Sequence, residues 1–295
     1  MNPCMRNKIK KYFRPAFFLS ISAALIWACQ IVLFRYQITI GENPYTLALW
    51  STAIELPFWI WMLFNKKGEI KRLNPKIIGI FIIIGFGSAI AIGLMENLAL
   101  ANTTATNFAF LIRTVVLFTI LFSAIFFKEP ITRKKLIMTF TILLGAYFLN
   151  VQSGRFILKL GDIFTLIEAA SIAFFTNILI KKMVTKLDPD FTAAAQYIAG
   201  SFFLVGIFIY QHTSLLLHNI PLLVLYAFLG ITFARVRNRA FQHASSTFVT
   251  MIMSFTPVFT LILSLFLLGE HLATIQLVGG FLIIITGFMA EFLKI

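Results

Sequence analysis

Long apolar runs separated by short polar segments occupy nearly the whole chain. Most runs are close to the roughly 20 residues that an α-helix needs to cross about 30 Å of hydrocarbon. The connections between the runs are short and leave no room for a soluble domain. The pattern predicts ten membrane-spanning helices, at residues 16–36, 44–64, 77–99, 104–127, 136–151, 160–181, 191–211, 220–240, 246–268 and 272–292.

One part of this pattern occurs twice. Residues 99–129 read ALANTTATNFAFLIRTVVLFTILFSAIFFKE, and residues 240–270 read AFQHASSTFVTMIMSFTPVFTLILSLFLLGE. An offset of 141 residues superimposes the two blocks without a gap and places Glu129 on Glu270. Each block contains a polar turn, an apolar helix and a glutamate just after it. Such a duplication is typical of membrane carriers in which one half moves against the other.

Composition and charge support a membrane protein. Hydrophobic residues make up 59% of the chain and charged residues 12%, about half the charged fraction of a soluble domain. The net charge of +14 comes largely from the N-terminal tail and the connections 66–76, 128–135 and 181–186. The opposite side carries only Arg35, Arg155 and Lys159. This asymmetry predicts a cytoplasmic-membrane protein with both termini in the cytoplasm, and the lysines flank apolar helices rather than forming a nucleic-acid-binding face.

The same charges indicate that the two halves have opposite orientations. Glu129 lies in the basic segment KEPITRKK, whereas Glu270 lies in GEHLAT, which has no lysine or arginine. Five spans per half is an odd number, so the second half enters the membrane in the opposite sense. We therefore expect an all-α membrane protein of ten transmembrane helices in two inverted five-helix repeats, residues 1–151 and 152–295, forming one membrane domain.

Several short motifs resemble those of a known family. They are the segment SFTPVF around Pro257, the pair Gly269-Glu270, the segment QLVGG and the late Gly287. The opening spans AALIWA at 23–28 and EAASIAF at 168–174 fit the same pattern. With these motifs the chain is similar, over nearly its whole length, to the EamA-type drug/metabolite transporters.

The resemblance implies inverted repeats, a central cavity lined by early and middle helices of each repeat, and alternating access. The chain departs from the family pattern in two ways. Val116 stands where the second half has Pro257, and the spans carry unusually many charges. Those charges are the features that we expect to reflect a particular substrate.

Four charged residues lie deep in the expected spans and are candidate substrate-binding residues: Arg113, Glu55, Glu168 and Arg235. A charge at the centre of a membrane helix costs a few kcal/mol, so each requires a partner or a polar surrounding. Arg113 either pairs with Glu55 or Glu168 as a structural element or meets substrate. Arg235 is equally compatible with a cavity and with an anchor at the membrane boundary. Glu55 is compatible with packing, proton acceptance or binding of an amine.

Neighbouring polar and aromatic residues extend the candidate site. Trp27 and Gln30 share one face of the first span, and Asn107 and Phe110 share one face of the fourth, each pair being three residues apart. Asn177 is interpreted as a residue that forms a hydrogen bond to a neighbouring helix. Arg237 and Arg239 lie within about one turn of the expected boundary, where long cationic side chains reach lipid phosphates. A structural role is expected for Glu96.

The sequence lacks the motifs that catalysis requires. It contains no HExxH, CxxC, GxSxG or P-loop segment, and its four histidines are expected on both sides of the membrane. We therefore expect no enzyme activity, cofactor or metal. The predicted function is secondary transport of a small polar metabolite, best an amino acid or its derivative, with a coupling proton or an exchanged solute. Carriage of phosphorylated or nucleotide-linked solutes and a non-transporting structural or partner-binding role are the alternatives.

Overall fold

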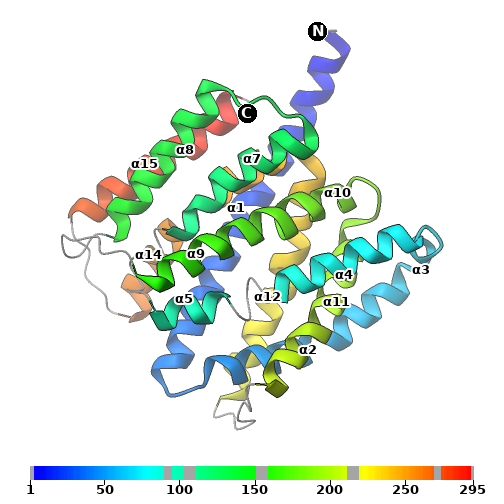
Figure 1. The fold of residues 1–295 in the computed structure, drawn as a ribbon. Coiled ribbons are helices and arrows are strands. Elements are labelled where there is room, and N and C mark those ends of the chain that lie inside the picture. The colour runs from blue at the N-terminus through cyan, green and yellow to red at the C-terminus, as the bar shows by residue number, and fades with distance from the viewer. Residues whose placement is uncertain are drawn as a thin grey trace.

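The computed structural model describes residues 3–89, 95–102, 111–150, 159–210, 219–268 and 274–293, and these form helices without a strand (Figure 1). In chain order the helices are α1 (Pro3–Thr39), α2 (Pro44–Asn65), α3 (Lys67–Ile70), α4 (Pro75–Ala89), α5 (Glu96–Asn102), α7 (Val115–Phe127), α8 (Arg133–Asn150), α9 (Leu160–Ser171), α10 (Ile180–Val184), α11 (Pro189–Tyr210), α12 (Ile220–His243), α13 (Ser246–Met253), α14 (Thr256–Leu268) and α15 (Thr274–Leu293). A 3₁₀ turn, η2 (Ile112–Thr114), precedes α7, and a π-helical segment, η3 (Ile172–Leu179), joins α9 to α10.

Seven helical segments of the described chain are long and apolar enough to cross a membrane. Two shorter apolar segments, Pro75–Ala89 and Ile112–Phe127, accompany them. Large apolar side chains are exposed on the outside of the helices, among them Phe18, Phe64, Phe140, Phe202, Phe228 and Phe281. Such an exterior suits hydrocarbon, where helices satisfy their own backbone hydrogen bonds.

The two halves begin their second and third expected spans in the same way. Asn43 and Asp188 cap α2 and α11, each side chain accepting hydrogen bonds from backbone N–H groups two and three residues further on. Asn74 and Asn219 accept from the backbone N–H three residues on, at the start of α4 and α12. Proline follows each cap within two residues. These side chains satisfy backbone donors that a helix leaves unpaired at its start.

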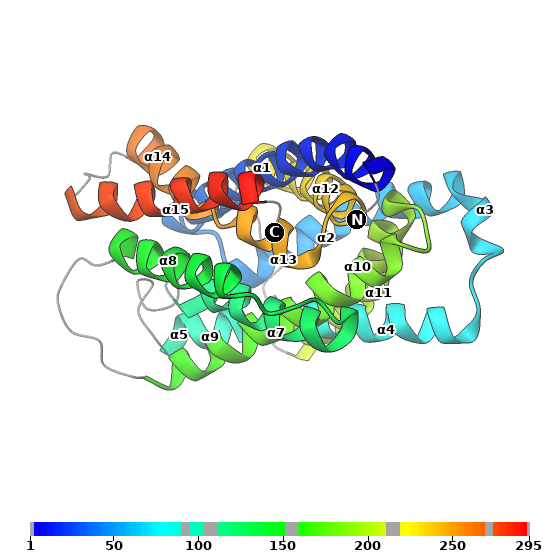
Figure 2. The ribbon, with the colours of Figure 1, turned by 90° about the horizontal axis from the view of Figure 1, so that it is seen from above.

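Helices from the two halves pack against each other throughout the molecule. Figures 1 and 2 show α8 beside α15, α1 beside α12, and α4 and α2 around α11. Two close approaches depend on glycine. A Cβ on Gly145 would lie 2.8 Å from the Gly279 carbonyl oxygen, and one on Gly85 would lie 2.7 Å from the Ala199 Cβ. Small residues of this kind let helix backbones approach closely, here those of α4 and α11.

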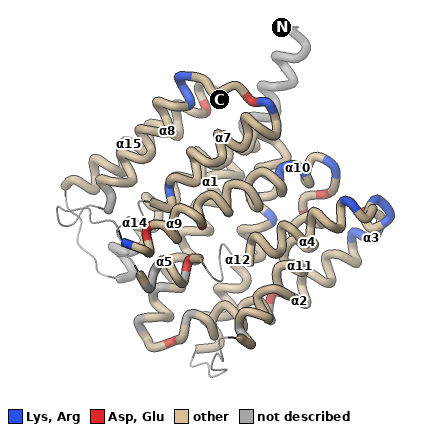
Figure 3. The backbone as a smooth tube through the Cα atoms, in the orientation of Figure 1, with Lys and Arg blue, Asp and Glu red and all other residues tan. Residues whose placement is uncertain are grey.

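The described lysines and arginines gather mainly along one margin of the molecule. Figure 3 shows them at α3, at the end of α10 and around the connection from α7 to α8, on the same side as the C-terminus. These segments are the ones that the sequence places on the cytoplasmic side. We call the end of the molecule formed by these segments the basic margin.

Candidate functional site

The candidate site lies where α1 and α12 pack as antiparallel helices. Tyr226, Gly230, Phe233 and Arg237 recur every three or four residues and therefore share one face of α12. Phe34 of α1 meets Tyr226 with ring centroids 6.0 Å apart. One end of this interface thus consists of two aromatic rings.

Trp27 forms the other aromatic pair of this interface. Its ring stacks on Phe233 with centroids 5.9 Å apart and an interplanar angle of 29°. Trp27 therefore faces α12. The first expected span supplies one wall of the site and the eighth supplies the facing wall.

Glu55 of α2 reaches the middle of this interface. Its Oε2 accepts a hydrogen bond from Trp59 Nε1 at 3.2 Å, and the Trp59 ring stacks on Tyr197 at 4.9 Å. A Cβ on Gly230 would lie 2.5 Å from Glu55 Oε1 and 3.2 Å from Gln30 Nε2. Glycine at position 230 is therefore what allows a carboxylate and an amide to approach the α12 backbone.

Arg113 contributes the first cation of the site. It lies in the 3₁₀ turn η2 with only 8% of its surface exposed. Its guanidinium carbon lies 5.6 Å from the centre of the Trp27 ring, a cation–π arrangement. Its buried Nε has no hydrogen-bond partner among the described residues, and neither Glu55 nor Glu168 forms an ion pair with it there.

Arg237 contributes a second cation, and here the sequence expectation is wrong. Arg237 is not extended to the membrane boundary but is 8% exposed. Its guanidinium carbon lies 5.1 Å from the centre of the Phe233 ring, and its Nη2 donates to Gln196 Oε1 at 3.1 Å. Gln196 Nε2 in turn donates to Ser88 Oγ at 3.3 Å, which links α12 and α11 to α4. The spacing of Arg237 from Phe233 and Gly230 is the signal that could have revealed it.

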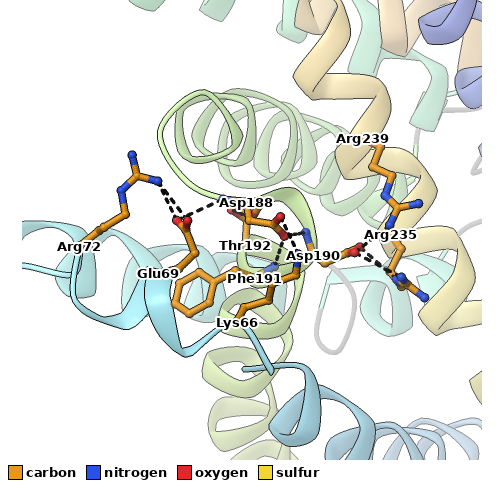
Figure 4. A network of polar contacts seen from close by, with 9 residues as sticks. All are labelled: Lys66, Glu69, Arg72, Asp188, Asp190, Phe191, Thr192, Arg235 and Arg239. Atoms are coloured by element: carbon orange, nitrogen blue, oxygen red, sulfur yellow. Dashed lines mark hydrogen bonds and ion pairs between the residues drawn. The ribbon is translucent and has the colours of Figure 1, made fainter. Parts of the chain in front are cut away.

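Arg235 is placed differently from the other candidates. Its Nε and Nη2 donate to the two carboxylate oxygens of Asp190 at 3.0 and 3.2 Å, and Arg239 donates to the same carboxylate at 2.8 Å. Figure 4 shows that these ion pairs lie beside Asp188, whose carboxylate accepts from the Asp190 backbone N–H and from Lys66, the latter at 2.9 Å. The arrangement is an ion-pair network between α2 and α11–α12 at the basic margin, apart from Trp27 and Arg113.

Glu168 lies on α9, which packs against the 3₁₀ turn η2 that carries Arg113. It is 3% exposed, and its Oε2 has no hydrogen-bond partner in the described part of the chain. It belongs to α9, against which α5, the helix of Glu96, packs. Neither glutamate forms an ion pair with a described residue.

The π-helical segment η3 begins four residues after Glu168, at the end of α9. Asn177 within it donates to Thr119 Oγ1 at 3.0 Å and to Thr250 Oγ1 at 3.2 Å, which confirms its predicted helix–helix hydrogen bonding. Segments of this kind are frequent at functional sites. Of the remaining expectations, Asn107, Phe110 and Glu270 lie outside the described residues. The described residues contain no cluster of three His, Cys, Asp or Glu side chains that could hold a metal.

Comparison with known proteins agrees with the helical architecture and the motifs. The sequence profile of the EamA-like transporter family matches residues 14–151 and again residues 159–290. The chain belongs to the EamA-like transporter family. It is thus a transporter of this family, and members of the family are generally not enzymes.

Individual EamA relatives are distant but extend over most of the chain. An uncharacterized transporter of Archaeoglobus fulgidus is 26% identical over 271 residues, covering 88% of this chain and 91% of the relative. An uncharacterized transporter of Methanothermobacter thermautotrophicus is 24% identical over 266 residues, covering 85% and 77%. A protein crystal structure aligns with a TM-score of 0.74 at 15% identity, covering 94% of this chain and 98% of its own. That alignment establishes a shared fold.

Proposed function

We propose that this EamA-family transporter is a secondary carrier of a small zwitterion, best an amino acid or its derivative. The observation that carries the proposal is the set of buried charges without a counter-charge among the described residues. Arg113 contacts an aromatic ring, Glu55 accepts from an indole, and Glu168 retains an oxygen without a partner. A structural role would favour mutual pairing of these charges, since a buried unpaired charge is costly.

A zwitterion supplies the missing charges of both signs. Its carboxylate would bind the Arg113 guanidinium beside Trp27, because guanidinium and carboxylate form strong, charge-assisted hydrogen bonds. Its ammonium would bind Glu55 or Glu168, and the carboxylate that it does not use would take a coupling proton. Asn107 and Phe110 are retained as further contacts from the fourth span. The sequence contains no P-loop, so transport would draw on a gradient or on exchange.

Alternating access between two inverted five-helix repeats is the mechanism that we propose. The caps of α2 and α11, and of α4 and α12, support equivalent halves. So do the first residues of α7 and α14, which coincide after the 141-residue offset. The interface of α1 and α12 joins the halves. Rocking of one half about this interface would expose the zwitterion site to each side in turn.

The orientation can be tested by cysteine labelling of intact cells. In a variant lacking Cys4 and Cys29, we expect Gly68→Cys at the basic margin to be protected from a membrane-impermeant maleimide. Ile40→Cys, in the connection between α1 and α2, should be labelled. Gly68 has open space around it and Ile40 is 42% exposed, so both cysteines are sterically tolerable. Labelling of position 68 with protection of position 40 would reverse the orientation.

Uptake into proteoliposomes tests the substrate class. Labelled amino acids would be offered to vesicles containing the purified protein, in competition with unlabelled amino acids and with sugar phosphates. We expect amino acids to compete. Competition by sugar phosphates alone would favour the alternative of phosphorylated solutes, for which Arg235 is poorly placed because its guanidinium already pairs with the Asp190 carboxylate through Nε and Nη2. Uptake no faster than in protein-free vesicles would favour a structural role.

A further inference from the structure

Arg237 differs from the two arginines on either side of it in the sequence. Arg235 and Arg239 bind the Asp190 carboxylate and are 34% and 46% exposed in their side chains. Arg237 is on another face of α12, is 8% exposed, and bonds only to the neutral amide oxygens of Gln196 and Asn238. Residues 235–239 of α12 therefore contain two arginines that share one carboxylate and one arginine that has no carboxylate partner among the described residues.

The contacts of Arg237 hold it in one orientation while leaving donors available. Nε and Nη2 are the donors to Gln196 and Asn238, and the guanidinium lies over the Phe233 ring. Nη1 makes no hydrogen bond to a described residue, so its two N–H groups remain free of protein acceptors there. A fixed guanidinium with free donors is a pre-organised binding group for an oxyanion.

The charges of the candidate site indicate what Arg237 would bind. A neutral amino acid brings one carboxylate for Arg113 and one ammonium for Glu55, and it leaves Arg237 without a counter-charge. A substrate with a second anionic group would match all three residues. Arg237 and Arg113 lie over the two stacked rings of Phe233 and Trp27, so both belong to the α1–α12 interface.

We propose that Arg237 binds a second anionic group of the substrate, so that amino acids with an acidic side chain are preferred over their neutral isosteres. This inference rests on the proposed function, because it assumes an amino acid bound between Arg113 and Glu55. The second group is a carboxylate or a phosphate ester, which share the oxyanion chemistry that a guanidinium recognises. Arg237 is then a specificity-determining residue of the proposed carrier.

The test compares matched ligands on the purified full chain. L-glutamate against L-glutamine, and O-phospho-L-serine against L-serine, differ mainly in the side-chain anion. We expect the acidic member of at least one pair to raise the unfolding temperature more than its neutral mate. The acidic member should also inhibit proteoliposome uptake at a concentration at least about tenfold lower than its neutral mate. A difference of this size corresponds to the free energy of one hydrogen bond to a charged group.

Variants then assign the preference to one arginine. Arg237→Gln should abolish the preference while retaining binding of the neutral ligands, and Arg237→Lys should restore it in part. Arg239→Gln is the matched control, since it removes an arginine only two residues away. In this variant Asp190 is still paired with Arg235, and the full preference should remain.

Three results would overturn the proposal. If neutral ligands act as strongly as acidic ones on the wild type, the site does not recognise a second anionic group, and the proposed function still stands. Retention of the acidic preference in Arg237→Gln would assign the second anion elsewhere. Failure of every amino acid to bind would overturn both this inference and the proposed function. The wild-type comparison decides the first of these even if Arg237→Gln does not fold.

Discussion

In each half a short turn that is not α-helical, called here the interruption, precedes an apolar helix at matched positions: η2, which carries Arg113, before α7, and residues 254–255 before α14. After the 141-residue offset, η2 (Ile112–Thr114) falls on residues 253–255, where the chain turns between α13 and α14. The helices that follow then begin at equivalent residues, Val115 in α7 and Thr256 in α14. The interruption is therefore a property of both halves.

The residues that accompany the two interruptions are different. Pro257 follows the second, and Val116 stands at the equivalent position after the first. In both, a threonine hydroxyl bonds back to the carbonyl three residues earlier, from Thr114 to Leu111 at 2.6 Å and from Thr256 to Met253 at 2.7 Å. Such back-bonding bends helices, so the interruption does not depend on proline alone.

The chemistry at the interruption is where the halves diverge. Ser254 donates its hydroxyl to the Thr250 carbonyl at 3.2 Å and is satisfied within its own helix. Arg113, at the equivalent position, lies over Trp27 with an unpaired Nε in the described structure. At this pair of positions the turn occurs in both halves, whereas the charged residue occurs only in the first.

The largest effect is expected from making the first half resemble the second at this position. Arg113→Ser should reduce amino-acid uptake by about a hundredfold or more, because a guanidinium–carboxylate contact makes two charge-assisted hydrogen bonds. The unfolding temperature without ligand should stay the same or rise, because no described carboxylate loses a partner. Ser254→Ala is the matched control and should retain uptake. A strongly destabilised Arg113→Ser would assign the arginine to structure.

Proline substitutions test whether the first half tolerates the residue of the second. Ile120→Pro, inside α7 and 3% exposed, should lower the free energy of unfolding by about 3 kcal/mol or more. Val116→Pro lies in the first turn of α7 and should cost less than about 1 kcal/mol, since proline is tolerated there. Denaturation in detergent measures both. Equal losses at the two positions would contradict the equivalence of the interruptions.

Asn177 connects the two interrupted helices, so its loss should have an intermediate effect. Asn177→Ala removes hydrogen bonds to Thr119 of α7 and Thr250 of α13. At about 0.6 kcal/mol for each interhelical hydrogen bond in a membrane protein, we expect a loss near 1 kcal/mol. A double-mutant cycle with Thr119→Val should show coupling. Additive effects would mean that the bond contributes nothing.

The smallest effect concerns the end of α7. Lys128 has a left-handed φ of 55°, and the equivalent residue of the second half is Gly269. Lys128→Gly should stabilise the protein by about 0.5–1 kcal/mol, because glycine adopts this conformation without strain. Lys134→Gly, in the first turn of α8, should destabilise it instead. Loss of stability in Lys128→Gly would indicate that the lysine side chain, rather than the backbone, matters there.

Much of the site could be predicted from helical spacing alone. Trp27 and Gln30 share a face because they are three residues apart, and that face packs on α12. Asn177 was identified as a polar residue in an apolar span, and it bridges two helices. Glu55 was recognised by its depth. In each case a local property of the sequence was sufficient.

Arg237 was misplaced because its distance from the end of the helix was considered without the face of the helix that it occupies. Arg235 and Arg239, on another face of α12, bind Asp190 at the basic margin. Arg237, two residues from each, lies against Phe233 and Gln196 instead. Its partner Gln196 lies on another helix, and the importance of Gly230 comes from side chains of two other helices. Contacts of this kind depend on packing that no single segment encodes.

Counterflow in proteoliposomes tests the central claim most directly, since only a carrier whose site alternates between the two sides exchanges solutes. Vesicles containing the purified protein would be loaded with an unlabelled amino acid identified in the competition assay and diluted into a trace of the labelled form. The account predicts a transient accumulation of label above equilibrium, present in the wild type and absent in Arg113→Ser. Uptake in the wild type that is the same in loaded and empty vesicles would contradict it.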